Sequence, residues 1–105
     1  MDKTLLAVNG TLMRGLELNP NMLAVGAMFV REDRTDACYR IWTIGDRHPA
    51  MLRTPGEGRQ VALELWSVPS AGLATILQNE PPGLSIGKVV LADGSIVLGV
   101  LGEPF

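Results

Sequence analysis

Short apolar runs separated by glycine, proline and polar clusters recur along the chain, which is the pattern of a β-rich fold. Leu5–Val8 is a continuous apolar run that ends at Asn9-Gly10 and predicts a buried strand. Alternating β-forming residues predict strands over Tyr39–Ile44 and Gln60–Val68. Ala27–Val30 predicts a further strand that leads into a charged polar turn.

Two segments have helical signals. Asn19-Pro20 is a helix start, with Asn19 as the expected cap, and the next residues allow one or two turns before Gly26. Pro69–Asn79 predicts the main helix, because proline suits the first turn and apolar residues recur on one face. The residues expected on that face are Leu73, Ile76 and Leu77.

The end of the chain predicts a hairpin. Ile86–Leu91 and Ile96–Leu101 flank Asp93-Gly94, a dipeptide typical of tight turns between strands. Gly45–Gly58 contains two prolines and predicts the longest loop. About six strands of uneven spacing, with one main helix, favour an α+β fold in which a small mixed sheet curls or closes into a barrel.

Composition narrows the class of protein. The 105 residues predict one domain over 1–105, and a net charge of -2 without a basic cluster argues against a nucleic-acid partner. One cysteine and one histidine are too few for disulfides or a typical zinc site, so we expect no metal and no cofactor. The first apolar run is too short for a signal sequence, and no run approaches the ~18 residues of a membrane span. We therefore expect a cytoplasmic protein without membrane contact.

The loop between Gly10 and Gly15 is the first candidate site. N–H groups that converge in a glycine-bearing loop can bind a carboxylate or an amide oxygen, and the alternative is an ordinary turn. We expect Gly10 to have a positive φ, so that Gly10→Val abolishes ligand binding. The ligand-binding candidates are Asn9, Gly10, Thr11, Leu12, Met13, Arg14 and Tyr39.

Side chains elsewhere leave alternatives open. Glu64 shares a strand face with Trp66, so it is either inside, as a catalytic candidate in a cavity, or outside and ordinary. Tyr39 and Trp42 lie on opposite faces of one strand, so one belongs to the core and the other to a pocket or an interface. His48 lies in a polar loop without a second histidine or a cysteine nearby, which favours a solvated side chain.

Several short motifs carry a family resemblance. Val8–Gly15, directly after a buried strand, looks like the Tyr-Gly-Ser-Leu loop of γ-glutamyl cyclotransferase-like proteins. The remaining motifs follow the order found in the C-terminal domain of allophanate hydrolase, which the chain resembles over nearly its whole length. These motifs are Leu16-Glu17-Leu18-Asn19, Tyr39-Arg40-Ile41, Leu63-Glu64-Leu65-Trp66, Ile86-Gly87, Asp93-Gly94-Ser95 and Gly102-Glu103-Pro104.

The resemblance implies a γ-glutamyl cyclotransferase-like fold and a catalytic glutamate. In γ-glutamyl cyclotransferases the general acid/base is a glutamate just after the helix that follows the Trp-bearing strand, and Glu80 stands at the matching distance from Trp66. Three positions depart from the family patterns. Asn9 replaces the loop tyrosine, Leu12 stands where the allophanate hydrolase domain has a histidine, and Pro81 replaces the glycine after the glutamate.

Two functions are compatible with these residues. The first is a stand-alone domain that binds a small carboxylate, a urea-derived compound or a γ-glutamyl-like compound, with proton transfer through Glu80 or Glu64. Its chemistry would be of the lyase, cyclotransferase or decarboxylase type, because 105 residues leave no room for the Ser–Ser–Lys amidase of allophanate hydrolase.

The second function is a non-catalytic module that forms a homo-oligomer or docks onto a separately encoded amidase. A charged fraction of only 19% supports it, since a low charge leaves more surface for apolar contacts. The apolar residues expected to form the interaction patch are Met13, Leu16, Met22, Met28, Met51 and Leu52.

Overall fold

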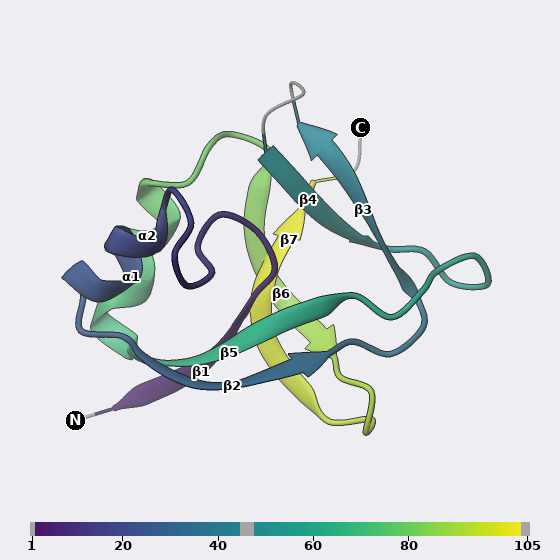
Figure 1. Cartoon of the computed structure of the whole chain (residues 1–105), viewed down its shortest axis with the longest axis horizontal. Helices are drawn as coiled ribbons and strands as arrows, with labels where there is room; N and C mark the ends of the chain where they lie inside the picture. The colour runs from purple at the N-terminus through teal and green to yellow at the C-terminus, as the bar shows by residue number, and fades with distance from the viewer. Residues whose placement is uncertain (1, 45–47, 104–105) are drawn as a thin grey trace.

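Seven strands and two short helices make up the part of the chain that the computed structural model describes, residues 2–44 and 48–103 (Figure 1). The strands are β1 (Lys3–Val8), β2 (Met28–Arg34), β3 (Tyr39–Ile44), β4 (His48–Arg53), β5 (Ala62–Pro69), β6 (Leu84–Val90) and β7 (Ile96–Gly102). The helices are α1 (Asn19–Ala24) and α2 (Leu73–Gln78), and a single 3₁₀ turn over Ser70–Gly72 leads into α2.

Five strands form a mixed sheet in the order β2-β5-β1-β7-β6, and β3 and β4 form a separate two-stranded ribbon. The central strand β1 runs antiparallel to β5 and parallel to β7. The sheet curls without closing into a barrel (Figure 1). The predicted α+β fold with a curled mixed sheet is confirmed.

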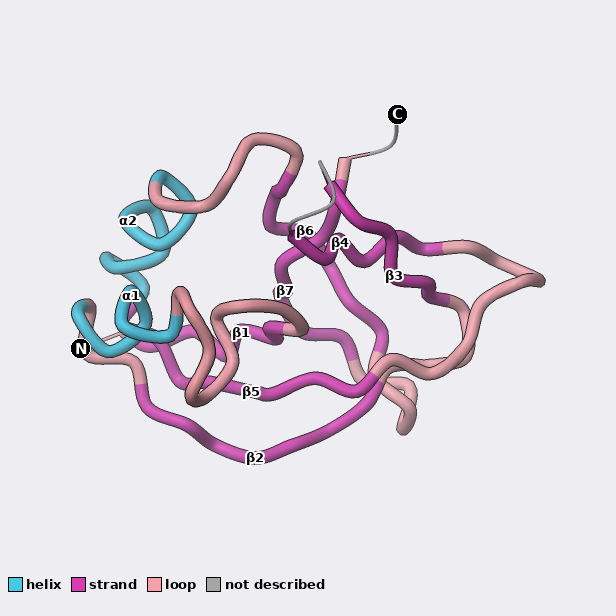
Figure 2. Tube along the Cα trace, turned by 45° about the horizontal axis from the view of Figure 1, so that its top comes forward, coloured by secondary structure: helices cyan, strands magenta, loops and turns pink. Residues whose placement is uncertain are grey.

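Each face of this sheet covers its own apolar core, because side chains alternate along β1 and β5. One core joins the sheet to the helices and contains Leu6, Val8, Leu12, Met22, Trp66, Val68, Ile76 and Val100. The other joins it to the β3–β4 ribbon and contains Ala7, Tyr39, Met51, Leu63, Leu65, Val89 and Leu91. Figure 2 shows the helices gathered at one end of the molecule and the ribbon at the other.

The hairpin of β6 and β7 has the predicted turn. Leu91 N–H donates to the Ser95 carbonyl at 2.8 Å, and Gly94 has φ +87, a value that glycine adopts without steric cost. The Asp93 carboxylate accepts from the N–H of Ser95 at 2.9 Å, which fixes the turn from the side.

The prediction of one long loop over Gly45–Gly58 is wrong, because β4 lies within it. Proline suggested a loop, but β4 pairs only with β3, and a strand with one open edge tolerates a residue without an N–H. Ala50 and Met51 are each 1% exposed, so apolar burial holds the strand in place. β2 also continues to Arg34, through the residues expected to form a polar turn.

The main helix is shorter than predicted. Ile76 is 1% exposed and Leu73 packs against the first core, as expected, but Leu77 is 37% exposed. A helix of six residues has room for one buried row only, which leaves Leu77 at the rim. None of the helices in residues 2–44 and 48–103 is long and apolar enough to span a bilayer.

Candidate functional site

A small pocket lies where the loop after β1, the start of β4 and the segment after α2 meet. It is lined by Val8, Asn9, Gly10, Thr11, Leu12, His48, Pro49, Glu80, Leu84 and Val100. We call it the Glu80 pocket. The empty space between its atoms is about 270 Å³ when the open mouth is included. The centre of a water-sized sphere can move within only about 10 Å³ of this space. That is room for about one water molecule or the head of a compact ligand.

Three polar side-chain atoms at this pocket are buried without a partner. Within residues 2–44 and 48–103, Asn9 Nδ2, His48 Nδ1 and Glu80 Oε1 are the buried side-chain N and O atoms that make no hydrogen bond. Leaving such a group unsatisfied costs about 1–3 kcal/mol. All three belong to residues that line the Glu80 pocket, so this pocket is the place where a water or a ligand group would recover that cost.

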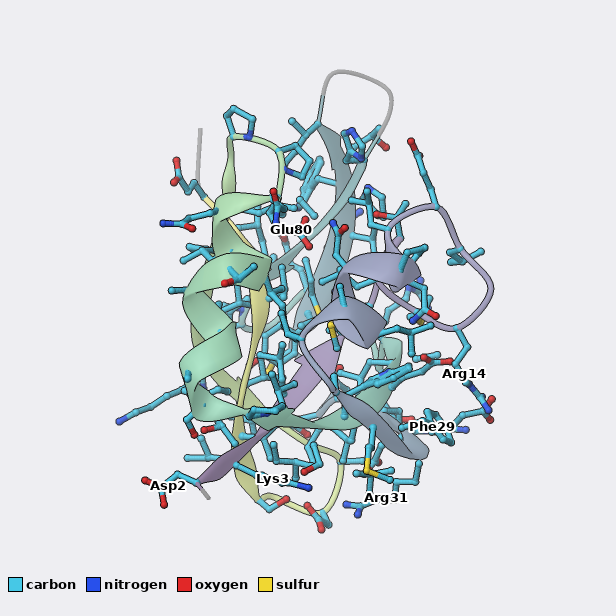
Figure 3. The ribbon with its side chains drawn as sticks, turned by 90° about the vertical axis from the view of Figure 1, so that its left-hand side faces the viewer. Asp2, Lys3, Arg14, Phe29, Arg31 and Glu80 are labelled. Carbon is cyan, nitrogen blue, oxygen red and sulfur yellow. The ribbon has the colours of Figure 1, made fainter. Side chains whose placement is uncertain are left out.

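Glu80 is the glutamate that the sequence placed at the site. It follows α2 and lies on the inner side of the helix, well away from Arg14 (Figure 3). Burial raises the pKa of its carboxyl above the ordinary value, because removal from water disfavours the charged form. A carboxyl with a raised pKa can donate or accept a proton nearer neutral pH, although such shifts also occur outside active sites.

The loop after β1 reaches the pocket through its close approach to β4. A Cβ built on Gly10 would lie 3.0 Å from Pro49 Cγ, so any larger residue at position 10 pushes this contact apart. The expectation of a positive φ at Gly10 is wrong, since the glycine of this loop with a left-handed backbone is Gly15, at φ +77. Glycine at position 10 is required by space and at position 15 by conformation.

Most of the loop is braced by its own backbone. Met13 N–H donates to the Gly10 carbonyl at 3.0 Å, and Leu18 N–H donates to the Thr11 carbonyl at 2.9 Å. Asn19 does not cap α1 as predicted; its Nδ2 instead donates to the Leu12 carbonyl at 2.8 Å. The N–H groups of Thr11 and Leu12 donate to no acceptor among residues 2–44 and 48–103, which leaves them for a bound group.

Glu64 lies outside the Glu80 pocket and is fully paired. Its carboxylate accepts from Arg14 N–H at 2.9 Å, Arg14 Nε at 3.0 Å and Trp66 Nε1 at 3.1 Å. Burial by itself raises the pKa of Glu64, but the hydrogen bonds from Arg14 and Trp66 outweigh it and hold the pKa below the ordinary value. Glu64 therefore anchors the loop and does not line the Glu80 pocket; its catalytic role stays a prediction.

Arg14 is committed to the protein as well. Its guanidinium also pairs with Glu32 at 2.9 Å and stacks over the Phe29 ring at 3.7 Å (Figure 3). A guanidinium with these partners is not aimed at a ligand, and Met13, the residue before it, packs against the first core. The geometry does not support the predicted ligand-binding roles of Arg14 and Met13, because neither residue lines the Glu80 pocket.

Tyr39 belongs to the second core. It is 0% exposed, and its hydroxyl accepts from Val90 N–H at 3.0 Å. Trp42, on the other face of β3, is 47% exposed. The prediction that one of the two is core is confirmed. The structure does not bring Tyr39 to the Glu80 pocket, and its ligand-binding role stays a prediction.

His48 is the pocket residue that sequence reasoning missed. It was expected in a solvated loop, yet as the first residue of β4 it is partly buried and its Nδ1 lies at the pocket. Only the β3–β4 pairing brings it there, and no spacing in the sequence signals that pairing. Residues 2–44 and 48–103 contain no group of three His, Cys, Asp or Glu that could hold a metal ion.

An open depression elsewhere offers less. It has a volume of about 520 Å³, crosses β2 and β5 and is lined by Met13, Glu32, Asp33, Arg34, Ala62, Leu63 and Glu64. Its principal carboxylates are already in ion pairs, Glu32 and Glu64 with Arg14 and Asp33 with Arg31. A site whose charged groups are mutually satisfied has little to gain from a ligand.

Comparison with known proteins assigns the family. Residues 4–105 match the model of the allophanate hydrolase C-terminal domain. The chain belongs to this family. As an allophanate hydrolase C-terminal domain it is 31% identical, over 99% of its length, to a urea amidolyase from Lachancea kluyveri. It spans only 6% of that curated relative, which is therefore a far longer protein.

Two solved structures place this C-terminal domain among known folds. The crystal structure of c4763, a uropathogenic E. coli-specific protein, is 64% identical, with a TM-score of 0.95 over 98% of this chain and 81% of that one. A γ-glutamyl cyclotransferase shares the fold, at a TM-score of 0.65 and 15% identity, over 97% of this chain and 68% of its own. The predicted resemblance in family and in fold is confirmed.

Proposed function

We propose that this allophanate hydrolase C-terminal domain binds the carboxylate or amide head of a small molecule in the Glu80 pocket. The observation that carries the proposal is the convergence of three unpaired, buried polar atoms on one small cavity. Native proteins satisfy nearly all such atoms, so three at one place mark a cavity whose walls can hydrogen-bond a small polar molecule. The pocket admits only a compact head, with the rest of the molecule outside its mouth.

The groups around the cavity suit a planar head with an oxygen and a hydrogen-bonding nitrogen or second oxygen. Asn9 Nδ2 and the N–H groups of Thr11 and Leu12 are donors for an oxygen. The Glu80 carboxyl accepts an N–H or O–H when ionised and donates when protonated. Glu80 would act as the general acid/base, since its raised pKa favours proton exchange with the ligand.

A urea-derived compound is the first substrate class to examine. The L. kluyveri relative is a urea amidolyase by name, and a urea-derived compound carries the planar amide head that the pocket groups suit. A γ-glutamyl-like compound is the second class, supported by the fold alone.

The test is a ligand titration of tag-free protein followed by ¹H–¹⁵N NMR. Acetate, acetamide and urea at millimolar concentrations should move the signals of the Asn9 side chain and of the Thr11 and Leu12 backbone. Glu80→Gln should weaken the binding of acetamide and urea several-fold. Glu57→Gln changes an exposed carboxylate that does not line the pocket and should leave the titration unchanged. Signals that stay in place with all three compounds would contradict the proposal.

A docking module for an amidase is the alternative, and several exposed apolar side chains support it. Leu16 is 45% exposed, Met28 61% and Trp42 47%. The predicted patch is otherwise reduced, because Met22 and Met51 are core residues with 0% and 1% exposure. Sedimentation at tens of micromolar separates the two proposals: a pure monomer with an occupied Glu80 pocket favours ligand binding, and self-association favours the module.

A further inference from the structure

Among residues 2–44 and 48–103, His48 is the titratable residue of the Glu80 pocket to which the proposed function assigns no role. It is the first residue of β4 and pairs with Ile44 of β3. The next residue, Pro49, packs against Gly10. These contacts fix the backbone at the pocket wall. The Nδ1 atom is buried and makes no hydrogen bond within residues 2–44 and 48–103.

In the described residues, buried polar side chains away from the Glu80 pocket have partners. Glu64 has three donors, Asn19 donates to Leu12, and the Thr35 hydroxyl donates to the Asp36 carbonyl at 2.7 Å. The fold thus satisfies buried groups even where they lie deep in its cores. His48 departs from this rule at the same cavity as Glu80, although the two come from segments far apart in the sequence.

We propose that His48 contacts the bound molecule through Nδ1 and that, when the pocket binds a carboxylate, His48 takes up one proton from solvent and donates it in a hydrogen bond to that carboxylate. The inference rests on the proposed function, because it needs a small molecule in the Glu80 pocket.

The charges around the cavity favour this proton. Among residues 2–44 and 48–103, His48 and Glu80 are the titratable residues of the pocket wall; the loop after β1, β6 and β7 contribute Asn9, Thr11 and apolar or backbone groups. In this part of the chain no cation lines the pocket, so a carboxylate beside an ionised Glu80 would place two negative charges together. Protonation of the imidazole removes one unit of negative charge, and histidine is the side chain that titrates nearest neutral pH. No bond in the ligand breaks.

An uncharged amide of the same shape needs no such proton. Acetate and acetamide therefore form a matched pair of probes. Acetate should bind more tightly as the pH falls from 8 to 6, by up to about tenfold per pH unit, which is the limit for one linked proton. Acetamide should bind with an affinity that changes little over this range.

Two substitutions assign the proton to a side chain. His48→Asn keeps a nitrogen near the Nδ1 position but cannot take up a proton, so acetate should lose its pH dependence while acetamide still binds. Glu80→Gln removes one of the two negative charges but leaves the imidazole that donates to the carboxylate, so acetate should still bind more tightly as the pH falls. A pH dependence that survives in His48→Asn and disappears in Glu80→Gln would place the proton on Glu80 and overturn the assignment.

A direct measurement uses the single histidine of the chain. Long-range ¹H–¹⁵N spectra of tag-free protein report the imidazole of His48 alone. Saturating acetate should move both ring nitrogen signals toward the protonated form. If acetate moves the Thr11 and Leu12 signals but not those of His48, the inference about His48 is wrong and ligand binding stands; if nothing moves, both proposals are wrong.

Discussion

Glu64 and Glu80 are both withdrawn from water, but the protein pairs only one of them. Glu64 receives three hydrogen bonds from Arg14 and Trp66, and its pKa is lowered although burial alone would raise it. Glu80 has a buried Oε1 without a partner, and burial raises its pKa. The paired carboxylate holds the loop after β1 in place, whereas the unpaired one keeps its capacity to bind and to exchange a proton.

Removal of the paired carboxylate should have the largest effect on stability. Glu64→Ala leaves the N–H of Arg14 and the indole N–H of Trp66 without acceptors, which should lower the free energy of unfolding by about 2–4 kcal/mol. Glu80→Gln breaks no bond to Oε1 and should stay within about 0.5 kcal/mol of wild type at mildly acidic pH. Urea denaturation measures both, and equal losses would remove the distinction between the two glutamates.

Gly10 lies at the Glu80 pocket and Gly15 follows Arg14, which Glu64 holds in place. Substitutions at the two glycines therefore test the pocket and the held segment separately. Gly15→Ala should cost about 1–2 kcal/mol, because φ +77 is unfavourable for a side chain, and should leave ligand binding unchanged. Gly10→Ala has an ordinary backbone, but its Cβ meets Pro49 at 3.0 Å and should displace the wall that carries His48. We expect weaker ligand binding from Gly10→Ala, measured by NMR titration, with a thermal stability closer to wild type than that of Gly15→Ala.

The pH dependence of stability should have opposite signs at the two carboxyls. Glu80 has a folded pKa above its unfolded value of about 4.3, so its contribution is fully present below that value and is lost as the pH rises through the folded pKa. The stability of Glu80→Gln relative to wild type should therefore increase from pH 4 toward pH 8. Denaturation at several pH values measures this, and a constant difference would mean that Glu80 is solvated.

The stability that Glu64 contributes should change with pH in the opposite direction. Its folded pKa is lowered, so the stability it contributes is present above about pH 4.3 and is lost as the pH falls through the folded pKa. The stability advantage of wild type over Glu64→Gln should shrink on acidification, in the same denaturation series.

The smallest effect on stability is expected from the more exposed of the two ion pairs of Arg14, the pair with Glu32. The Glu32 side chain is 76% exposed, and exposed pairs contribute little because water and salt screen them. Glu32→Ala should change the free energy of unfolding by less than about 0.5 kcal/mol. A loss as large as that of Glu64→Ala would show that Arg14 depends on Glu32 for its position.

Local patterns predicted the elements whose interactions are local. The β6–β7 hairpin follows from Asp93-Gly94 between apolar runs, and β5 follows from its alternation. β4 was missed because a proline near its start outweighed a three-residue apolar stretch. β4 forms because it pairs with β3 and is buried against the second core. Neither interaction can be predicted from its own six residues.

The candidate site shows the same limit. Glu80 was found through a family resemblance, and the structure places it at the pocket with the loop after β1. Alternation put Glu64 on the face of Trp66 but could not say that Arg14 would reach it. His48 joins the pocket only through tertiary pairing, so no motif could identify it. The backbone of Gly10 was mistaken because glycine serves both close approach and left-handed turns.

The central place of β1 has a consequence for how the chain acquires its structure. Leu6 pairs with Trp66 on one side and with Leu98 on the other, so the first strand must wait for partners near the middle and the end of the sequence. Such distant contacts make folding slow for a protein of this length. Of the seven strands, β1 is synthesised first; it can pair with β5 once that strand has been made, but it gains its second neighbour only when β7 has been synthesised. The Glu80 pocket, bounded by both Val8 and Val100, is thus among the last features to form.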